Sequence, residues 1–207
     1  MNAKPSRHAR AREAAKQETR AALIRAATEV FSKKGIDASL DEICAHAGYT
    51  RGAFYVHFKN RDELAAAVME RVGQGVLDTL LGTDEAQPIE NLGDLVNRFI
   101  KALISGDYPL TRNGGVRPYQ LLDACARSSA IRDQYMEHVR ASMDRLGGIC
   151  QRLQTQGEIR NDITPQQLGF WLVTLVIGLH TLYDLDMEID FAGSMQSLLK
   201  LVQPPAA

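Results

Sequence analysis

One short stretch of this chain combines hydrogen-bonding side chains with a cation. Thr50 and Tyr55 each bring a hydroxyl group, and Arg51 brings a guanidinium group. A guanidinium can bind both O6 and N7 of guanine, and hydroxyl groups can donate to phosphate oxygens. Together with Gly52, these residues would form the outward side of a helix that starts at Thr50 and ends at Phe58. The chemistry of this side is that of contact with a DNA duplex.

Two amphipathic helices joined at a glycine are predicted to position these side chains. Ser39 lies three residues before Glu42, so the pair can form a capping box at the start of the first helix. Gly48 can adopt the left-handed conformation that ends this helix and turns the chain. Thr50 can cap the second helix. The apolar stripe of the first helix consists of Leu40, Ile43, Cys44 and Ala47, and that of the second consists of Ala53, Phe54 and Phe58.

Helical patterns flank this pair on both sides. The upstream helix closes at Lys33, Lys34 and Gly35. Its buried face is predicted to contain Leu23, Ala26, Ala27, Val30 and Phe31. Downstream, Asn60 and Glu63 form a second capping signature. They open a helix with the apolar side Leu64, Ala67, Val68, Val72 and Val76. Three helices should therefore share one core, and a fourth should continue into the rest of the chain.

The stretch from about Thr19 to Met69 resembles the N-terminal DNA-binding domain of the TetR family of bacterial transcription regulators. The residues on the family pattern are Phe31, Gly35, Ile43, Ala47, Gly48, Phe54, Tyr55, His57, Phe58, Lys59 and Leu64. The resemblance implies an all-α fold. An N-terminal three-helix DNA-binding domain with a helix-turn-helix (residues 19–61) would precede a helical ligand-binding and dimerisation domain (62–207). The family usually has a small or hydroxylated residue where Arg51 stands, so base preference is not carried over.

Position and resemblance together suggest roles for side chains around the turn. Thr50 and Arg51 are expected to reach bases or the flanking phosphate, and Arg51 is itself a candidate reader of guanine. Thr19 and Ser39 are expected at helix N-termini, where they could donate to phosphates. In the family, the positions of Tyr55, His57 and Lys59 commonly contact the DNA backbone. The expected DNA-binding residues are Thr19, Ser39, Thr50, Arg51, Gly52, Tyr55, His57, Lys59 and Arg61, and the expected partner is a palindromic double-stranded DNA operator.

Charge is distributed unevenly along the chain. Residues 1–61 carry twelve Lys and Arg against six Asp and Glu, whereas residues 62–207 carry twelve against nineteen. A basic module on an acidic body suits phosphate binding without general adhesion to nucleic acid. Residues 1–18 are expected to form a disordered basic arm that either reaches into a minor groove or stays solvated. No apolar stretch follows its charges, so it does not resemble a signal peptide.

The rest of the chain is predicted to be helical, at about residues 88–105, 117–128, 131–156, 165–183 and 190–201. The most apolar segment of the chain, residues 169–185, is shorter than the ~20 residues of a membrane span and contains Thr174 and His180. It should be a buried helix, and a partner subunit is the economical cover. The resemblance implies a homodimer through helices 165–183 and 190–201. A monomeric core helix is the alternative reading.

A dimer could read two half-sites only when its recognition helices lie about one duplex turn apart, ~34 Å, or a multiple of it. A small-molecule inducer that separates the body helices would therefore release DNA, as the family's inducers are understood to do. An apolar or aromatic compound is expected, with one specific metabolite as an alternative. The candidate lining residues, each of which could instead be plain core, are Phe99, Leu103, Tyr119, Leu122, Tyr135, Met136, Val139, Met143, Phe170, Trp171 and Thr174.

The sequence offers no carrier for catalysis. It contains no glycine-rich phosphate loop, nucleophile elbow or His-Glu-x-x-His motif, so we predict no enzyme activity and no cofactor. His180 and Asp184 lie one helical turn apart, but no further ligands repeat at a tight spacing, so we predict no metal site. The cysteines Cys44, Cys125 and Cys150 form no CxxC pair, which fits a reduced cytoplasm. A redox switch between Cys125 and Cys150 is a further alternative.

Overall fold

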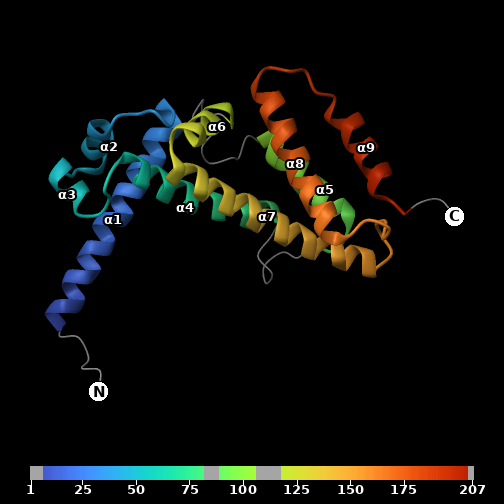
Figure 1. The fold of residues 1–207 in the computed structure, drawn as a ribbon, viewed down its shortest axis with the longest axis horizontal. Helices are drawn as coiled ribbons and strands as arrows, with labels where there is room; N and C mark the ends of the chain where they lie inside the picture. Colours follow the sequence, from blue (N-terminus) through green and yellow to red (C-terminus); the bar gives the residue numbers. More distant parts are fainter. Residues whose placement is uncertain (1–6, 82–88, 106–117, 205–207) are drawn as a thin grey trace.

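The computed structural model describes residues 7–81, 89–105 and 118–204 (Figure 1). Every regular element in these ranges is a helix, which confirms the all-α prediction. The helices are α1 (Arg7–Lys34), α2 (Leu40–Ala47), α3 (Arg51–Tyr55), α4 (Arg61–Leu81), α5 (Leu92–Ser105), α6 (Pro118–Arg127), α7 (Ser129–Thr155), α8 (Pro165–Asp184) and α9 (Phe191–Val202). Helices α1 to α3 form one end of the molecule, α8 and α9 form the other, and α4 and α7 run between them.

The N-terminal helices share the core that the sequence predicts. Phe31 of α1, Ile43 of α2, Phe54 of α3 and Leu64 of α4 are at most 1% exposed and belong to one cluster. We call α1 to α3 with the first turns of α4 the helix-turn-helix unit. The same cluster includes Ala124, Cys125 and Ile131, from α6 and the start of α7. The core of this unit therefore continues past residue 61 and is completed by side chains of α6 and α7. We call the rest of α4 together with α5 to α9 the body.

Helix α1 starts earlier than predicted. Residues 1–18 were expected to be a disordered arm, but the helix runs without interruption from Arg7. The reason is composition, because residues 9–18 consist entirely of Ala, Arg, Glu, Lys and Gln, which favour helix. Residues 1–6 lie outside the described ranges.

Helix α7 lies between α4 and α8, and its crossing with α8 is very close. A Cβ atom on Gly169 of α8 would lie 2.7 Å from the carbonyl oxygen of Met143 and 2.9 Å from the backbone nitrogen of Gly147. Only glycine fits such an approach between backbones. A second core surrounds this crossing, with Val139, Leu146, Ile149, Cys150, Leu153, Leu168 and Val173 among its members.

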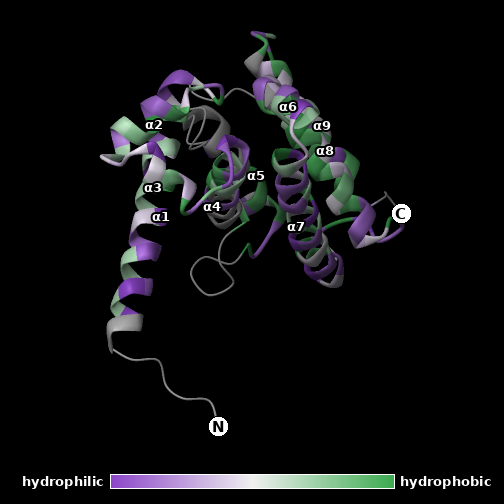
Figure 2. Cartoon of the chain, turned by 60° about the vertical axis from the view of Figure 1, so that its left-hand side comes forward, coloured by the Kyte–Doolittle hydropathy of each residue, from purple (hydrophilic) through white to green (hydrophobic). Residues whose placement is uncertain are grey.

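Helix α8 starts where the sequence predicts but is not buried within one chain. Thr164 and Gln167 form a capping box, and Pro165 occupies the first turn. On its outer side, Trp171 is 63% exposed and Tyr183 is 50% exposed, and apolar colouring continues along this helix (Figure 2). Beyond α8, Arg160 holds the end of α9 by donating to the carbonyl oxygens of Leu201 and Val202. None of the helices described here has the length and apolar character needed to cross a membrane.

Candidate nucleic-acid interface

Helix caps fix both ends of α2 and the start of α3. The Ser39 hydroxyl oxygen accepts from the backbone nitrogen of Glu42 at 3.3 Å, and the Ser39 nitrogen donates to the Glu42 carboxylate at 2.9 Å. Gly48 ends α2 with a φ of 73°, in the left-handed region. Thr50 caps α3 by accepting from the backbone nitrogen of Ala53 at 3.2 Å. The predicted capping box, glycine turn and Thr50 cap are all confirmed.

Glu42 has a second role at the start of α2. Its carboxylate accepts a hydrogen bond from Lys34 Nζ at 2.5 Å, at the end of α1. This bond, together with those from Ser39, lowers the pKa of Glu42 to about 2. The capping box is therefore also the ionic tie between the first two helices.

Helix α3 is shorter than predicted, because it spans Arg51–Tyr55 and is capped at Val56. The chain then bends so that Phe58 returns to the core, where its ring stacks on Phe54 with a centroid distance of 5.5 Å. Tyr55 is 57% exposed and Val56 is 65% exposed. Sequence reasoning missed Val56 as a surface residue. Its position four residues after Gly52, on the outward side, was the available signal.

Arg51 lies on the surface beside the first turn of α2. Its Nε and Nη2 atoms donate to the two carboxylate oxygens of Asp41 at 2.5 and 2.9 Å. Both side chains are more than half exposed, so the pair adds little to stability. The ion pair places the guanidinium at the surface of the unit, beside the start of α3.

His57 and Lys59 follow α3 on the same segment. His57 is half-buried, and burial, together with the charges of Lys16 and Arg20, lowers its pKa. The imidazole is therefore neutral at pH 7, and its Nδ1 atom has no hydrogen-bond partner among the described residues. The Lys59 side chain is exposed, and its backbone nitrogen donates to Glu63. The predicted cap at the start of α4 is confirmed, since Asn60 Oδ1 accepts from the Glu63 nitrogen at 2.9 Å.

Three expected DNA contacts need correction or refinement. Thr19 lies in the middle of α1 instead of at an N-terminus, and its hydroxyl donates to the Ala15 carbonyl oxygen. Arg61 points inward, because its Nε atom donates to the carbonyl oxygen of Ala38 at 2.8 Å and its guanidinium lies over the Phe31 ring. Ser39 is exposed at the N-terminus of α2, as expected, but its hydroxyl already donates to Glu42.

Comparison with known proteins places this geometry in a family. Residues 23–68 match the model of the bacterial regulatory proteins of the tetR family. The structure of SmeT with triclosan superposes with a TM-score of 0.61 and 30% identity, over 79% of this chain and 78% of SmeT. The chain belongs to the TetR family.

Two further relatives show how far the likeness reaches. SrpR of Pseudomonas putida, a helix-turn-helix transcriptional regulator, is 50% identical over 54 residues, or 26% of this chain and 25% of SrpR. The curated relatives are matched over less than two thirds of their lengths. Reduced E. coli NemR superposes with a TM-score of 0.72 over 92% of this chain and all of NemR, but at 18% identity it supports the fold alone.

In this TetR-family chain, the residues expected to line an inducer pocket do not form one group. Val139 and Met143 lie at the second core, and Tyr135 contacts both cores. Phe170, Trp171 and Thr174 instead lie on the exposed side of α8, because the side with Leu168 and Val173 packs in the core. The other members on α6 and α7, Tyr119, Leu122 and Met136, are exposed. The side chains of Phe99 and Leu103, like those of His180 and Asp184, lie outside the described ones.

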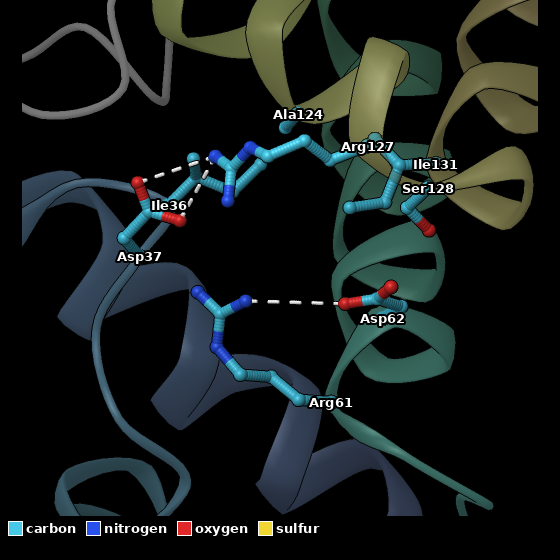
Figure 3. Close-up of a pocket in the computed structure, with 8 residues that line it drawn as sticks. All are labelled: Ile36, Asp37, Arg61, Asp62, Ala124, Arg127, Ser128 and Ile131. Carbon is cyan, nitrogen blue, oxygen red and sulfur yellow. Dashed lines mark hydrogen bonds and ion pairs between the residues drawn. The ribbon is translucent and has the colours of Figure 1, made fainter.

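A small cavity of about 60 Å³ lies where the body meets the helix-turn-helix unit (Figure 3). Arg127, at the end of α6, binds Asp37 in the loop after α1 at 3.2 Å and Asp123 at 2.9 Å. Asp37 is the main cause of the raised pKa of Arg127. Arg61 and Ile131 lie on opposite sides of this cavity. The volume is far below that of a drug-sized site, so the cavity is too small to be an inducer pocket. It marks where the body contacts the helix-turn-helix unit.

The cysteines are placed unfavourably for a redox switch. Cys125 lies in the first core and Cys150 lies in the second. Burial raises the pKa of both thiols, and that of Cys150 reaches about 11. Because the thiolate is the reactive form, both are poor nucleophiles at neutral pH. Cys44 is likewise buried with a raised pKa.

Proposed function

We propose that the protein is a cytoplasmic, homodimeric transcription repressor that inserts α3 into the major groove of an operator. The observation that carries this proposal is the outward side of α3. A rigid, capped turn presents Thr50, Arg51, Gly52 and Tyr55 on one exposed surface, with Lys59 following. The N-terminal residues of a recognition helix are those that meet base edges.

Within this interface, Arg51 is the base-reading residue. It exchanges the Asp41 carboxylate for guanine O6 and N7, a bidentate acceptor of the same shape. Tyr55 and Lys59 bind phosphates and fix the register of α3 without reading sequence. His57 is neutral and adds a hydrogen bond instead of a charge.

The dimer forms through the exposed apolar side of α8, together with α9. Trp171, Leu175 and Leu182 recur at intervals of four and seven residues and are between 37% and 63% exposed. A stripe with this spacing suits packing against a second helix. Two copies joined here would carry two α3 helices, which suits a palindromic operator.

A small apolar or aromatic inducer releases the dimer from DNA by changing the spacing of its two α3 helices. Support comes from SmeT, which was solved with triclosan and is described as the repressor of a multidrug efflux pump. In this chain we propose Tyr135 and Met143, which pack against the second core, as lining residues. A regulator specific for one metabolite is the second candidate, because no described residue selects between the two.

The experiment that tests the function is a binding titration on the DNA upstream of the protein's own gene. We expect binding that weakens with increasing salt and exceeds that of an unrelated duplex. Absence of duplex binding at low ionic strength would overturn the proposal.

The inducer is tested on the preformed complex with DNA. We expect triclosan-like compounds of several scaffolds to release the duplex and to raise the melting temperature of the protein. Release by only one member of a metabolite panel would favour the second candidate.

A further inference from the structure

The first half of α1 carries a line of cations outside the core of the helix-turn-helix unit. Arg12, Lys16 and Arg20 follow at intervals of four residues, so they lie along one face, about 6 Å apart on the helix axis. All three are exposed, whereas the buried part of α1 starts at Leu23. In Figure 1 and Figure 2 this half of α1 extends beyond α2 and α3, away from the body.

This line starts beside the turn that follows α3. The Arg20 guanidinium lies 5.0 Å from the centroid of the Phe58 ring. Lys16 and Arg20 are also close enough to His57 for their charges to help lower its pKa. The cations therefore extend outward from the same edge of the unit that holds the DNA-contacting segment.

The spacing of these cations costs helix stability when no anion is present. Like charges four residues apart on a helix repel each other. Glu13 flanks the line, but within the described part of the chain none of the three cations forms an ion pair with an acid. Glu18, on a different face, pairs with Arg25 at 2.9 Å. An anionic partner would relieve the repulsion.

We infer that Arg12, Lys16 and Arg20 form a second phosphate-binding line, which extends the DNA footprint of each subunit beyond α3. The inference rests on the proposed DNA-binding function. A duplex carries about one negative charge per 1.7 Å of axis, so a straight row of cations can follow its backbone. Such contacts add affinity and fix orientation, but they do not read sequence. The line is part of a continuous helix, so it tracks the outside of the duplex instead of entering the minor groove as a flexible arm.

The test is the salt dependence of operator binding by the full-length protein. The variant Arg12→Gln/Lys16→Gln removes two charges, and glutamine favours helix as arginine and lysine do. Arg20 is left in place because it contacts Phe58. The matched control, Arg140→Gln/Arg152→Gln, removes two exposed cations from α7. Arg10→Gln removes a cation from a different face of α1.

We expect the Arg12/Lys16 variant to show a slope of log K against log salt that is shallower by about one per removed cation in each subunit. Binding to operator and to unrelated duplex should weaken by the same factor. The α7 control and Arg10→Gln should keep the wild-type slope. The exchange Arg12→Lys/Lys16→Arg keeps both charges and should also keep it.

Each other outcome has a definite meaning. If the wild type binds and the Arg12/Lys16 variant keeps its slope, the line is refuted while the proposed function stands. If the wild type ignores duplex, both fall. If the slope changes equally in the α7 control or in Arg10→Gln, net charge explains the effect and the inferred line is refuted. If the Arg12/Lys16 variant changes base preference, the inferred contact with the DNA backbone is refuted. Far-UV circular dichroism shows whether the variants keep their helical content. If the glutamine variant loses helical signal, the test passes to Arg12→Lys/Lys16→Arg, which keeps both charges. A shallower slope in that variant refutes the inference.

Discussion

The two ends of the molecule expose different kinds of side chain. In the helix-turn-helix unit, Phe54 and Phe58 are turned inward, and apart from Tyr55 and Val56 the large exposed side chains are polar or charged. At the other end, Trp171 and Leu201 are both more than 60% exposed. A cationic, hydrated surface fits DNA, whereas a row of exposed apolar side chains requires a dry partner. This difference supports the proposal of one partner for each end: a duplex for the first and a second copy of the chain for the other.

The largest effect is expected from breaking the apolar end. Trp171→Glu places a charge in the middle of the α8 stripe, and burial of an unpaired charge is costly, so the dimer should dissociate. Loss of the second half-site contact should then weaken operator binding by about 10²- to 10⁴-fold. Sedimentation and anisotropy measure the two effects. Gln151→Glu, on the exposed side of α7, is the control, and a Trp171→Glu protein that stays dimeric contradicts the assignment.

Next in size is the core that supports the polar end. Phe54→Ala should lower the free energy of unfolding by about 3–5 kcal/mol, because it leaves a cavity under α3. Val56→Ala, two residues on and exposed, should change it by less than about 0.5 kcal/mol. Denaturant unfolding measures both. Equal losses in the two variants would mean that α3 does not pack as described.

Smaller effects are expected at the DNA-contacting surface itself. Arg51→Ala should cost about 1–3 kcal/mol of operator binding and relax preference at one base pair, because it removes a bidentate base contact. Tyr55→Ala should weaken binding to every duplex by a similar factor. A panel of operators with single substitutions separates the two. Uniform weakening by Arg51→Ala would show that this residue binds the backbone.

The smallest effect concerns the ionic tie at the start of α2. The folded-state pKa of Glu42 is about 2, below its ordinary value of 4.5, so its charge stabilises the fold above pH 4.5. That contribution is lost as the pH falls from 4.5 through about 2. Between pH 4.5 and about 2, Glu42→Gln should therefore flatten the dependence of the melting temperature on pH. At higher pH the slope of this dependence should be that of the wild type. If the melting temperature of Glu42→Gln falls with acid as steeply as that of the wild type, the ionic tie of Glu42 does not stabilise the fold.

The local parts of the DNA-binding end were predictable from sequence. Ser39 with Glu42, Gly48 and Thr50 act through bonds within a few residues, and such bonds leave a signature in the order of residue types. Arg61 was not predictable, because its partners, the Ala38 carbonyl group and the Phe31 ring, are distant in sequence.

The apolar end was harder to read for a different reason. Helix α8 is so uniformly apolar that periodicity does not mark the side facing α7. The close approach at Gly169 decides that side, and it leaves Phe170 and Trp171 outward. The start of α1 was missed because a helix without an apolar side gives no periodic signal, although its residue types favour helix.

The most direct measurement of the central claim is amide hydrogen exchange of the full-length protein with and without its operator duplex. The account predicts that DNA slows exchange in residues 50–57 while α8 keeps the exchange rates of the free protein. Protection confined to the body, with residues 50–57 exchanging as fast as in the free protein, would contradict it.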